Sequence, residues 1–178
     1  MVTRKYIRDY KLSESVSPGG RIITESVYVG GDYYLTAPTD TQKTTKALLV
    51  CLTALSWLVF IIALLPMSRA SHIFYIALPH AFSALPLALA TRAVIYLHSP
   101  QPYTRERSEK IAQGLPSGSA FCAGLSGAAL VGLIVTAVLT PEAMTSGDVV
   151  FGVCSALLTA ASAICFSKRR LLACKKRD

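Results

Sequence analysis

From residue 47 onward, long apolar stretches alternate with shorter polar segments. Four stretches, at about 47–65, 73–97, 119–139 and 149–167, contain no Asp, Glu or Lys. Each reaches the roughly 20 residues that a helix needs to cross about 30 Å of hydrocarbon. A soluble helical bundle would carry a charged stripe on each helix, and the last two stretches have none. The pattern therefore predicts an all-α integral membrane protein with four transmembrane helices.

The segment before the first stretch follows a different pattern, in which short apolar and polar runs alternate between about 6 and 37. This pattern predicts a small β-meander of two or three strands, with SPGG at 17–20 as one turn and Gly30, Gly31 and Asp32 as the tightest. Residues 38–45 are polar and predict a linker into the first helix. A sheet this small is marginally stable alone, so we expect it to rest on the membrane, on the middle loop or on a partner.

The polar segment between the second and third stretches, 98–118, predicts a short helix of its own. Thr104 is suited to cap its start, and Gly114 with Pro116 would end it. Two positions for this helix stay open. It lies along the lipid headgroups, or it forms a docking surface for the N-terminal segment.

The basic residues predict the orientation. The chain has 18 Lys and Arg residues, and all but Arg69 lie in 1–46, in 168–178, or between Arg92 and Lys110. The positive-inside rule then places both termini and the loop 98–118 in the cytoplasm. The predicted domains are a cytoplasmic head (1–46), a transmembrane domain (47–167) in the plasma membrane, and a basic cytoplasmic tail (168–178). Arg92 would reach the inner headgroups as an anchor.

Composition agrees with this picture and explains the net charge. The chain is 52% hydrophobic and 16% charged, with a mean hydropathy of +0.47. Its net charge of +8 arises next to the predicted membrane, where basic side chains attract anionic lipids. The expected partners are therefore the lipid bilayer and, at the basic tail, anionic lipids. No nucleic-acid partner is expected, because no known nucleic-acid-binding pattern accompanies the charge.

Two prolines interrupt the second apolar stretch. Pro79 and Pro86 each remove an amide donor, which would free the carbonyls of Tyr75 and Phe82. Such breaks are tolerated in a membrane where neighbouring groups satisfy the backbone. The sequence therefore predicts two kinks in this helix.

His80 follows the first of these prolines and is the candidate centre of an intramembrane polar site. Equal depth in the antiparallel helices would place Ser56, Trp57 and Ser155 near it. No Asp or Glu occurs in the four stretches, so a lone histidine would have to carry any proton chemistry. Two interpretations stay open. His80 is a neutral packing residue beside a kink, or it binds a solute or a proton.

Small residues recur every four positions in the last two stretches and are the candidate helix-packing residues. They are Ala120, Gly124, Ala128 and Gly132 in the third stretch, and Gly152, Ala156 and Ala160 in the fourth. Rows of this kind allow helix backbones to approach closely in lipid. Our first hypothesis is that the two rows face each other. The competing hypothesis is that a row faces another copy of the chain or another protein.

The motifs that would indicate an enzyme are missing from the sequence. It contains no paired intramembrane acids, no His-based metal motif, no Gly-x-Ser-x-Gly and no phosphate-binding glycine loop. We therefore expect no catalytic residue, cofactor or metal. The predicted function is that of a non-enzymatic accessory, scaffold or regulatory subunit on the cytoplasmic face, with a membrane-protein partner or as a homo-oligomer. The alternative is a small oligomeric transporter or channel component with a site near His80.

Overall fold

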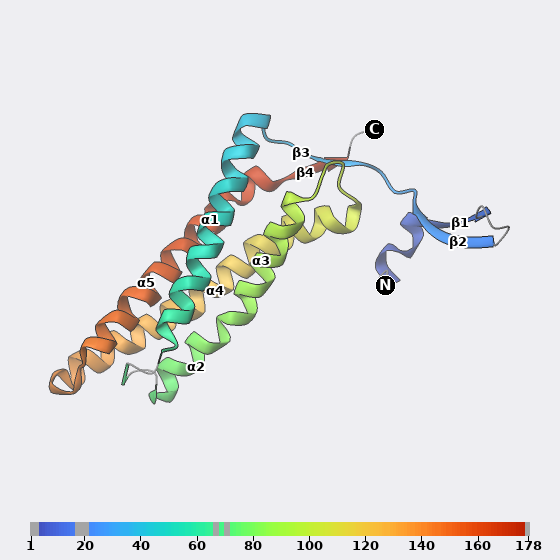
Figure 1. The fold of residues 1–178 in the computed structure, drawn as a ribbon. Helices are drawn as coiled ribbons and strands as arrows, with labels where there is room; N and C mark the ends of the chain where they lie inside the picture. The colour runs from blue at the N-terminus through green and yellow to red at the C-terminus, as the bar shows by residue number, and fades with distance from the viewer. Residues whose placement is uncertain (1–3, 17–21, 66–67, 70–71, 177–178) are drawn as a thin grey trace.

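Four long helical segments form the body of the molecule (Figure 1). The computed structural model describes residues 4–16, 22–65, 68–69 and 72–176, and this part is mostly helical. The helices are α1 (Thr39–Ala63), α2 (Phe74–Phe82), α3 (Ala84–His98), α4 (Arg105–Leu139) and α5 (Ser146–Ser167), with α5 continued by the 3-10 helix η4 (Lys168–Leu172). Counting α2 with α3 and α5 with η4, four helices are long and apolar enough to cross a membrane, as predicted.

Successive helical segments run in opposite directions, and each packs on its neighbours around the bundle (Figure 1). α5 lies between α1 and α4, and α4 also packs against α2 and α3. α1 completes the bundle by meeting α3. α4 makes extensive contacts with α2, α3 and α5. Its packing therefore decides how the bundle is assembled.

Two short strand pairs accompany the helices. β1 (Tyr10–Val16) and β2 (Ile22–Tyr28) form an antiparallel hairpin, preceded by the 3-10 helix η1 (Arg4–Asp9). The hairpin extends away from the bundle (Figure 1). β3 (Tyr33–Leu35) pairs with β4 (Cys174–Lys176), so segments from both ends of the chain form one small sheet.

Of the two or three strands predicted for the meander, two pair with each other, β1 and β2. β3 pairs with β4 instead, and the Tyr28 hydroxyl donates to the carbonyl of Gly31 at 3.0 Å in the turn between β2 and β3. Leu35 is buried in a core cluster with Leu49 and Leu172. Burial of this leucine places β3 against the bundle. The SPGG turn lies outside the described residues.

Two predicted loops are helical. The expected linker 38–45 begins α1, since Pro38 stands at its N-cap and Asp40 in the first turn favours a helix N-terminus. In the middle loop Thr104 caps a helix as predicted, and its hydroxyl accepts from the amide of Arg107. That helix does not end at Gly114 and Pro116 but continues as α4.

The continuity of α4 has a packing reason. Proline within a helix removes one hydrogen bond and strains the preceding turn. Ile111 and Leu115, on the turns before Pro116, are completely buried in the core cluster that includes α3. Burial of each side chain contributes on the order of 2 kcal/mol, which offsets the cost of the proline.

The second apolar stretch is interrupted once, between α2 and α3, and Pro79 lies inside α2. α2 ends at Phe82 and α3 begins at Ala84, with Ser83 between them. The Ser83 hydroxyl donates to the carbonyl of His80 at 2.6 Å, so this carbonyl keeps a hydrogen-bond partner at the break. Pro86 lies in the first turn of α3, where helix amides have no acceptor within the helix, and proline costs little there.

Buried side chains form two clusters along the bundle axis. One cluster lies toward residues 64–73 and 140–145, which we name the loop end, and it includes Phe60, Ile76 and Phe151. The other lies toward β3 and β4, which we name the sheet end, and it includes Leu49 and Tyr103. Tyr103 fastens the sheet end, since its backbone pairs with Tyr33 and its hydroxyl donates to the carbonyl of Leu97 at 2.8 Å.

Candidate functional site

His80 lies in the middle of the bundle between two aromatic rings. Its imidazole stacks on Phe60 of α1 at 5.1 Å between centroids and is tilted against Phe151 of α5 at 4.9 Å. The side chain is 1% exposed, and the backbone of Phe60 also lies beside it. The backbone of Phe60 acts on the imidazole as a weak hydrogen-bond partner, and neither ring nitrogen makes a hydrogen bond of full geometry with a described residue. The histidine therefore packs as an aromatic side chain.

No hydrogen bond joins the other residues of the predicted polar site to His80 in the described part of the chain. Trp57 donates through Nε1 to the Thr91 hydroxyl at 2.9 Å, which joins α1 to α3. Ser56 donates to the carbonyl of Leu52, one turn earlier in its own helix. Ser155 is fully buried, and its hydroxyl has no partner in the described part of the chain. No hydrogen bond therefore joins any two of the four residues in the described part of the chain.

The two rows of small residues do not face each other as first hypothesised. Ala120, Gly124 and Ala128 are exposed on the outside of α4, as are Ala156 and Ala160 on α5, while Gly132 and Gly152 are partly buried. A Cβ on Gly124 would meet nothing within 4 Å, whereas one on Gly132 would lie 3.1 Å from Ile76 of α2. Gly152 is the member of the α5 row that faces α4, because its Cβ would lie 2.8 Å from Leu133.

Backbones approach most closely at a glycine outside these rows. A Cβ on Gly118 would lie 2.7 Å from the carbonyl oxygen of Pro86 and 2.9 Å from the amide nitrogen of Ala90. Gly118 and Ala120 are two positions apart, which is about 200° around a helix of 3.6 residues per turn. The row beginning at Ala120 therefore points away from α3, and Gly118 allows α3 and α4 to meet.

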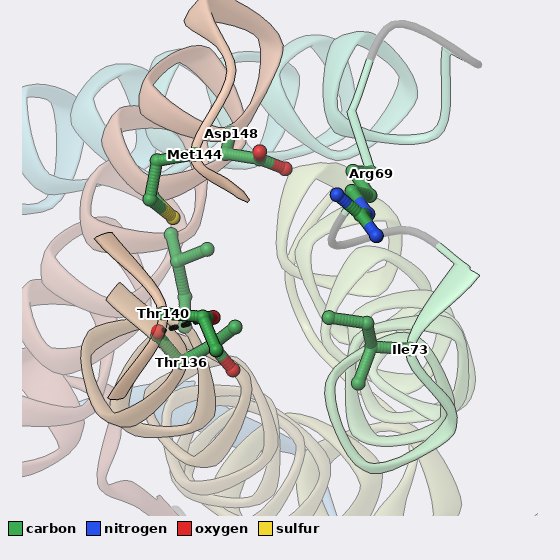
Figure 2. Close-up of a pocket in the computed structure, with 7 residues that line it drawn as sticks. Arg69, Ile73, Thr136, Thr140, Met144 and Asp148 are labelled. Carbon is green, nitrogen blue, oxygen red and sulfur yellow. Dashed lines mark hydrogen bonds between the residues drawn. The ribbon is translucent and has the colours of Figure 1, made fainter. Parts of the chain in front are cut away.

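A pocket opens at the loop end beside a buried carboxylate. Figure 2 shows Arg69 and Ile73 on one side of this pocket, of about 210 Å³, and Met144 with two threonines of the end of α4 on the other. Asp148 stands at its rim and is 2% exposed. Most of the exposed surface of the pocket is apolar, although Arg69, Asp148 and the two threonines contribute polar groups to its lining.

Asp148 holds the loop end together through hydrogen bonds. One carboxylate oxygen accepts from the Ser68 hydroxyl at 2.7 Å. The other accepts from the amide of Thr145 at 2.8 Å and from its hydroxyl at 2.7 Å. The amide of Asp148 donates back to the Thr145 hydroxyl, which completes a capping box at the start of α5. Asp148 thus joins the 64–73 connection to α5.

A third polar cluster joins the N-terminal segment to the start of α4. Glu109 accepts from Lys5, from the Tyr6 hydroxyl at 3.0 Å and from Arg105 Nε at 3.1 Å. Arg105 Nη1 also lies 3.9 Å from the carboxylate of Asp9. Because Lys5, Tyr6 and Asp9 belong to η1, this cluster, which we name the Glu109 cluster, docks the N-terminal segment on α4.

The pKa values around Glu109 follow from these contacts. The hydrogen bond from Lys5, and then those from Tyr6 and Arg105, lower the pKa of the Glu109 carboxyl. The same bond to Glu109 raises the pKa of Lys5. Burial, reinforced by the bond to Glu109, raises the pKa of Tyr6. Glu109 lies in the polar first turns of α4, ahead of the apolar part of that helix.

Comparisons with family models, curated proteins and solved structures find no match to this chain. Among the described residues, no group of three or more His, Cys, Asp or Glu side chains is placed to hold a metal. The contacts of Asp148 and of the Glu109 cluster join separate segments of the chain to one another. Their chemistry is that of docking and positioning.

Sequence reasoning assigned no role to Asp148 or Glu109. A signal for Asp148 was present, because Thr-Ser-Gly-Asp at 145–148 has the spacing of a capping box. The contacts of Glu109 could not be read from spacing, since Lys5 and Tyr6 lie far away along the chain. Two positions were considered for the start of α4, along the lipid headgroups or as a docking surface for the N-terminal segment. The structure has it as a docking surface, because Lys5 and Tyr6 contact Glu109.

Replacing His80 with phenylalanine is expected to change the free energy of unfolding by no more than about 1 kcal/mol. The ring would remain between Phe60 and Phe151, and two ring nitrogens that make no hydrogen bond of full geometry would be removed. His80→Ala is the matched variant, and its cavity should cost about 2–4 kcal/mol. Thermal unfolding in detergent measures both. A phenylalanine variant less stable than the alanine variant would assign a polar role to the imidazole.

Glu109→Gln is expected to release η1 from α4 while the helices stay folded, because neutral glutamine loses the ion pairs with Lys5 and Arg105. Hydrogen exchange of the amides in 4–16 should quicken at least severalfold. The control is Glu106→Gln, which removes a carboxylate that pairs with Lys110 of the same helix. Equal hydrogen-exchange rates of residues 4–16 in the Glu109→Gln and Glu106→Gln variants would contradict docking through Glu109.

The pH dependence of this docking has a definite sign. A lowered pKa means that the contribution of Glu109 is present above the ordinary carboxyl value of 4.5 and is lost as the pH falls through the lowered value. The raised pKa of Lys5 means that its contribution is present below 10.5 and is lost as the pH rises through the raised value. The amides of residues 4–16 should therefore exchange slowly, relative to their intrinsic rates at each pH, only between these two pH limits.

Proposed function

We propose that the chain is an integral membrane protein with four spanning helices and both termini in the cytoplasm. The outward faces of the helices support membrane insertion, because large apolar side chains such as Leu58, Leu85 and Val138 are more than half exposed there. In water this surface would be a liability, and in lipid it is a favourable contact. The basic residues gathered near the sheet end support the orientation.

Within the membrane the protein acts as a non-enzymatic scaffold or accessory subunit. The observation that carries this proposal is the assembly of the sheet end from both ends of the chain. β3 pairs with β4, Tyr103 bridges to Tyr33, and η1 docks on α4 through Glu109. A protein that only filled the membrane would have no need of such an ordered cytoplasmic platform.

The hairpin β1–β2 is the part of this platform offered to a partner protein. It projects away from the bundle (Figure 1), and its exposed side chains include Leu12 and Ile22, each at least two-thirds exposed. Both edges of a two-stranded sheet have unpaired backbone groups, which a further strand can satisfy. The partner would therefore contact the hairpin while the helices anchor it beside the membrane.

The proposal is tested by extracting the full chain from its native membrane in mild detergent and measuring the mass of the complex. A hetero-complex is expected. It should be lost when 10–28 are replaced by a flexible linker, while the α-helical circular dichroism stays. The control exchanges exposed Leu157 of α5 for alanine and should keep the complex.

Two results would contradict the proposal, the first its scaffold function and the second the role given to the hairpin. A closed homo-oligomer that persists without the hairpin would favour the alternative of a small transporter or channel component. A complex that keeps its partner without the hairpin would place the contact elsewhere. The surroundings of His80 do not favour transport, since aromatic rings enclose it, and both the loop-end pocket and the hollow between α3 and α4 are lined by other residues.

A further inference from the structure

A cavity of about 310 Å³ lies between α3 and α4 near the sheet end. Its apolar side is formed by Leu89 and Ala93 of α3, and its polar side by Arg92 of α3 with Lys110 and Gln113 of α4. The cavity belongs to neither the Asp148 network nor the surroundings of His80. Two cations from different helices thus line one hollow with apolar walls.

The positive charge in this cavity is not balanced by the acids around it. Arg92 and Lys110 lie 5.5 Å and 5.4 Å from the centre of the same Tyr96 ring. Lys110 pairs with Glu106, but in the described part of the chain Arg92 has no acidic partner and donates only through Nε to the Tyr96 hydroxyl. Glu109, which also lines the cavity, is already neutralised by Lys5 and Arg105. The remaining donors of the Arg92 guanidinium suit a phosphate.

The face of α3 that leads to Arg92 distinguishes a lipid from a soluble phosphate. Leu85, Leu89, Arg92 and Tyr96 follow one another at helical spacing along this face. Both leucines are more than half exposed, and the basic residue comes after them. A phospholipid matches this order. Its acyl chain would lie on the leucines, and its anionic phosphate would meet the arginine that follows them.

We propose that this cavity binds the headgroup phosphate of an anionic phospholipid. Arg92 holds the phosphate with help from Lys110, and an acyl chain lies along Leu89 and Leu85. The inference rests on the membrane insertion proposed above, but it does not depend on the scaffold function or on the hairpin. The site would fix one lipid between α3 and α4, beside the point where η1 docks.

The test compares phospholipids added to the purified full chain in mild detergent, with native mass spectrometry and thermal unfolding as readouts. Phosphatidylglycerol should bind and raise the unfolding temperature, and phosphatidylcholine should not. Arg92→Gln is expected to weaken phosphatidylglycerol binding about tenfold, the loss of a charge-assisted hydrogen bond. The control, Arg107→Gln, removes the same charge from exposed α4 surface outside the cavity and should keep affinity within about twofold.

The remaining outcomes overturn the inference. Equal weakening by Arg92→Gln and Arg107→Gln would mean that lipid binds the basic surface in general. Stabilisation by glycerol phosphate equal to that by phosphatidylglycerol would assign the cavity to a soluble phosphate. Equal binding of phosphatidylcholine would show that an anionic headgroup is not what the cavity selects. Each of these results leaves the scaffold function to be judged by its own experiment.

Discussion

Gly118→Ala is expected to lower the free energy of unfolding of the bundle by about 1–3 kcal/mol. The added methyl would lie 2.7 Å from the Pro86 carbonyl oxygen and 2.9 Å from the Ala90 amide nitrogen. Both are backbone atoms of α3, which cannot turn aside as a flexible side chain can. α3 and α4 must therefore move apart, and the core cluster between them loosens. The measurement is the unfolding temperature of the purified chain in a fixed detergent.

Gly124→Ala is the control for this substitution. It adds the same methyl to the same helix, at a position where nothing lies within 4 Å. It should not destabilise the chain, because alanine is favoured over glycine inside a helix by about 0.5–1 kcal/mol. If the Gly118 variant proved as stable as the Gly124 variant, α3 and α4 would not approach each other closely at Gly118.

Asp148→Asn is the second substitution with a large expected effect, a loss of about 2–3 kcal/mol. The variant keeps the size of the side chain. It replaces one carboxylate oxygen by an amide donor, which meets a donor of Ser68 or of Thr145. The loop end should open first, so hydrogen exchange of residues 145–150 is expected to quicken more than that of the sheet end.

The control for Asp148 is Glu142→Gln in the same connection. Glu142 is exposed, and its carboxylate has no hydrogen bond among those found in the described residues. Removing its charge should change stability by no more than about 0.5 kcal/mol. Equal stability of the two variants would show that the buried carboxylate does not hold α5 to the 64–73 connection.

The sequence predicted those features that depend on neighbouring residues. Runs of apolar residues indicated four long helices, and alternation indicated the hairpin β1–β2. The hydroxyl of Thr104 identified the start of a helix correctly. Each of these signals acts within one or two turns of the chain, so it can be read without knowing the packing.

Features that depend on distant contacts were missed. The helix that begins after Thr104 was predicted to end at Gly114 and Pro116, separate from the helix at 119–139, because nothing local shows that Ile111 and Leu115 become buried. β3 was assigned to a meander, although its partner β4 is at the other end of the chain. The row of small residues at Ala120 was chosen for its spacing, and spacing alone does not say which face of a helix meets a neighbour.

The candidate site was predicted only in part. His80 is buried, and the aromatic rings of Phe60 and Phe151 around it were not foreseen. Burial of a histidine can be inferred from an apolar stretch, whereas its partners come from other helices. Of the carboxylates with the clearest structural roles, Asp148 lies at a helix start that the sequence placed in a loop, and Glu109 lies in a predicted helix whose contacts with the N-terminal segment come from far along the chain.

The central claim, four spanning helices with both termini in the cytoplasm, is tested most directly by cysteine labelling across the membrane. Single reporters Glu25→Cys in the hairpin and Glu142→Cys at the loop end are placed in a chain carrying Cys174→Ala, whose own labelling gives the background. In intact cells a membrane-impermeant maleimide should label the Glu142→Cys reporter alone. The Glu25→Cys reporter should react only after the membrane is permeabilised. Labelling of the hairpin in intact cells, or of neither reporter before permeabilisation, would contradict the proposed topology.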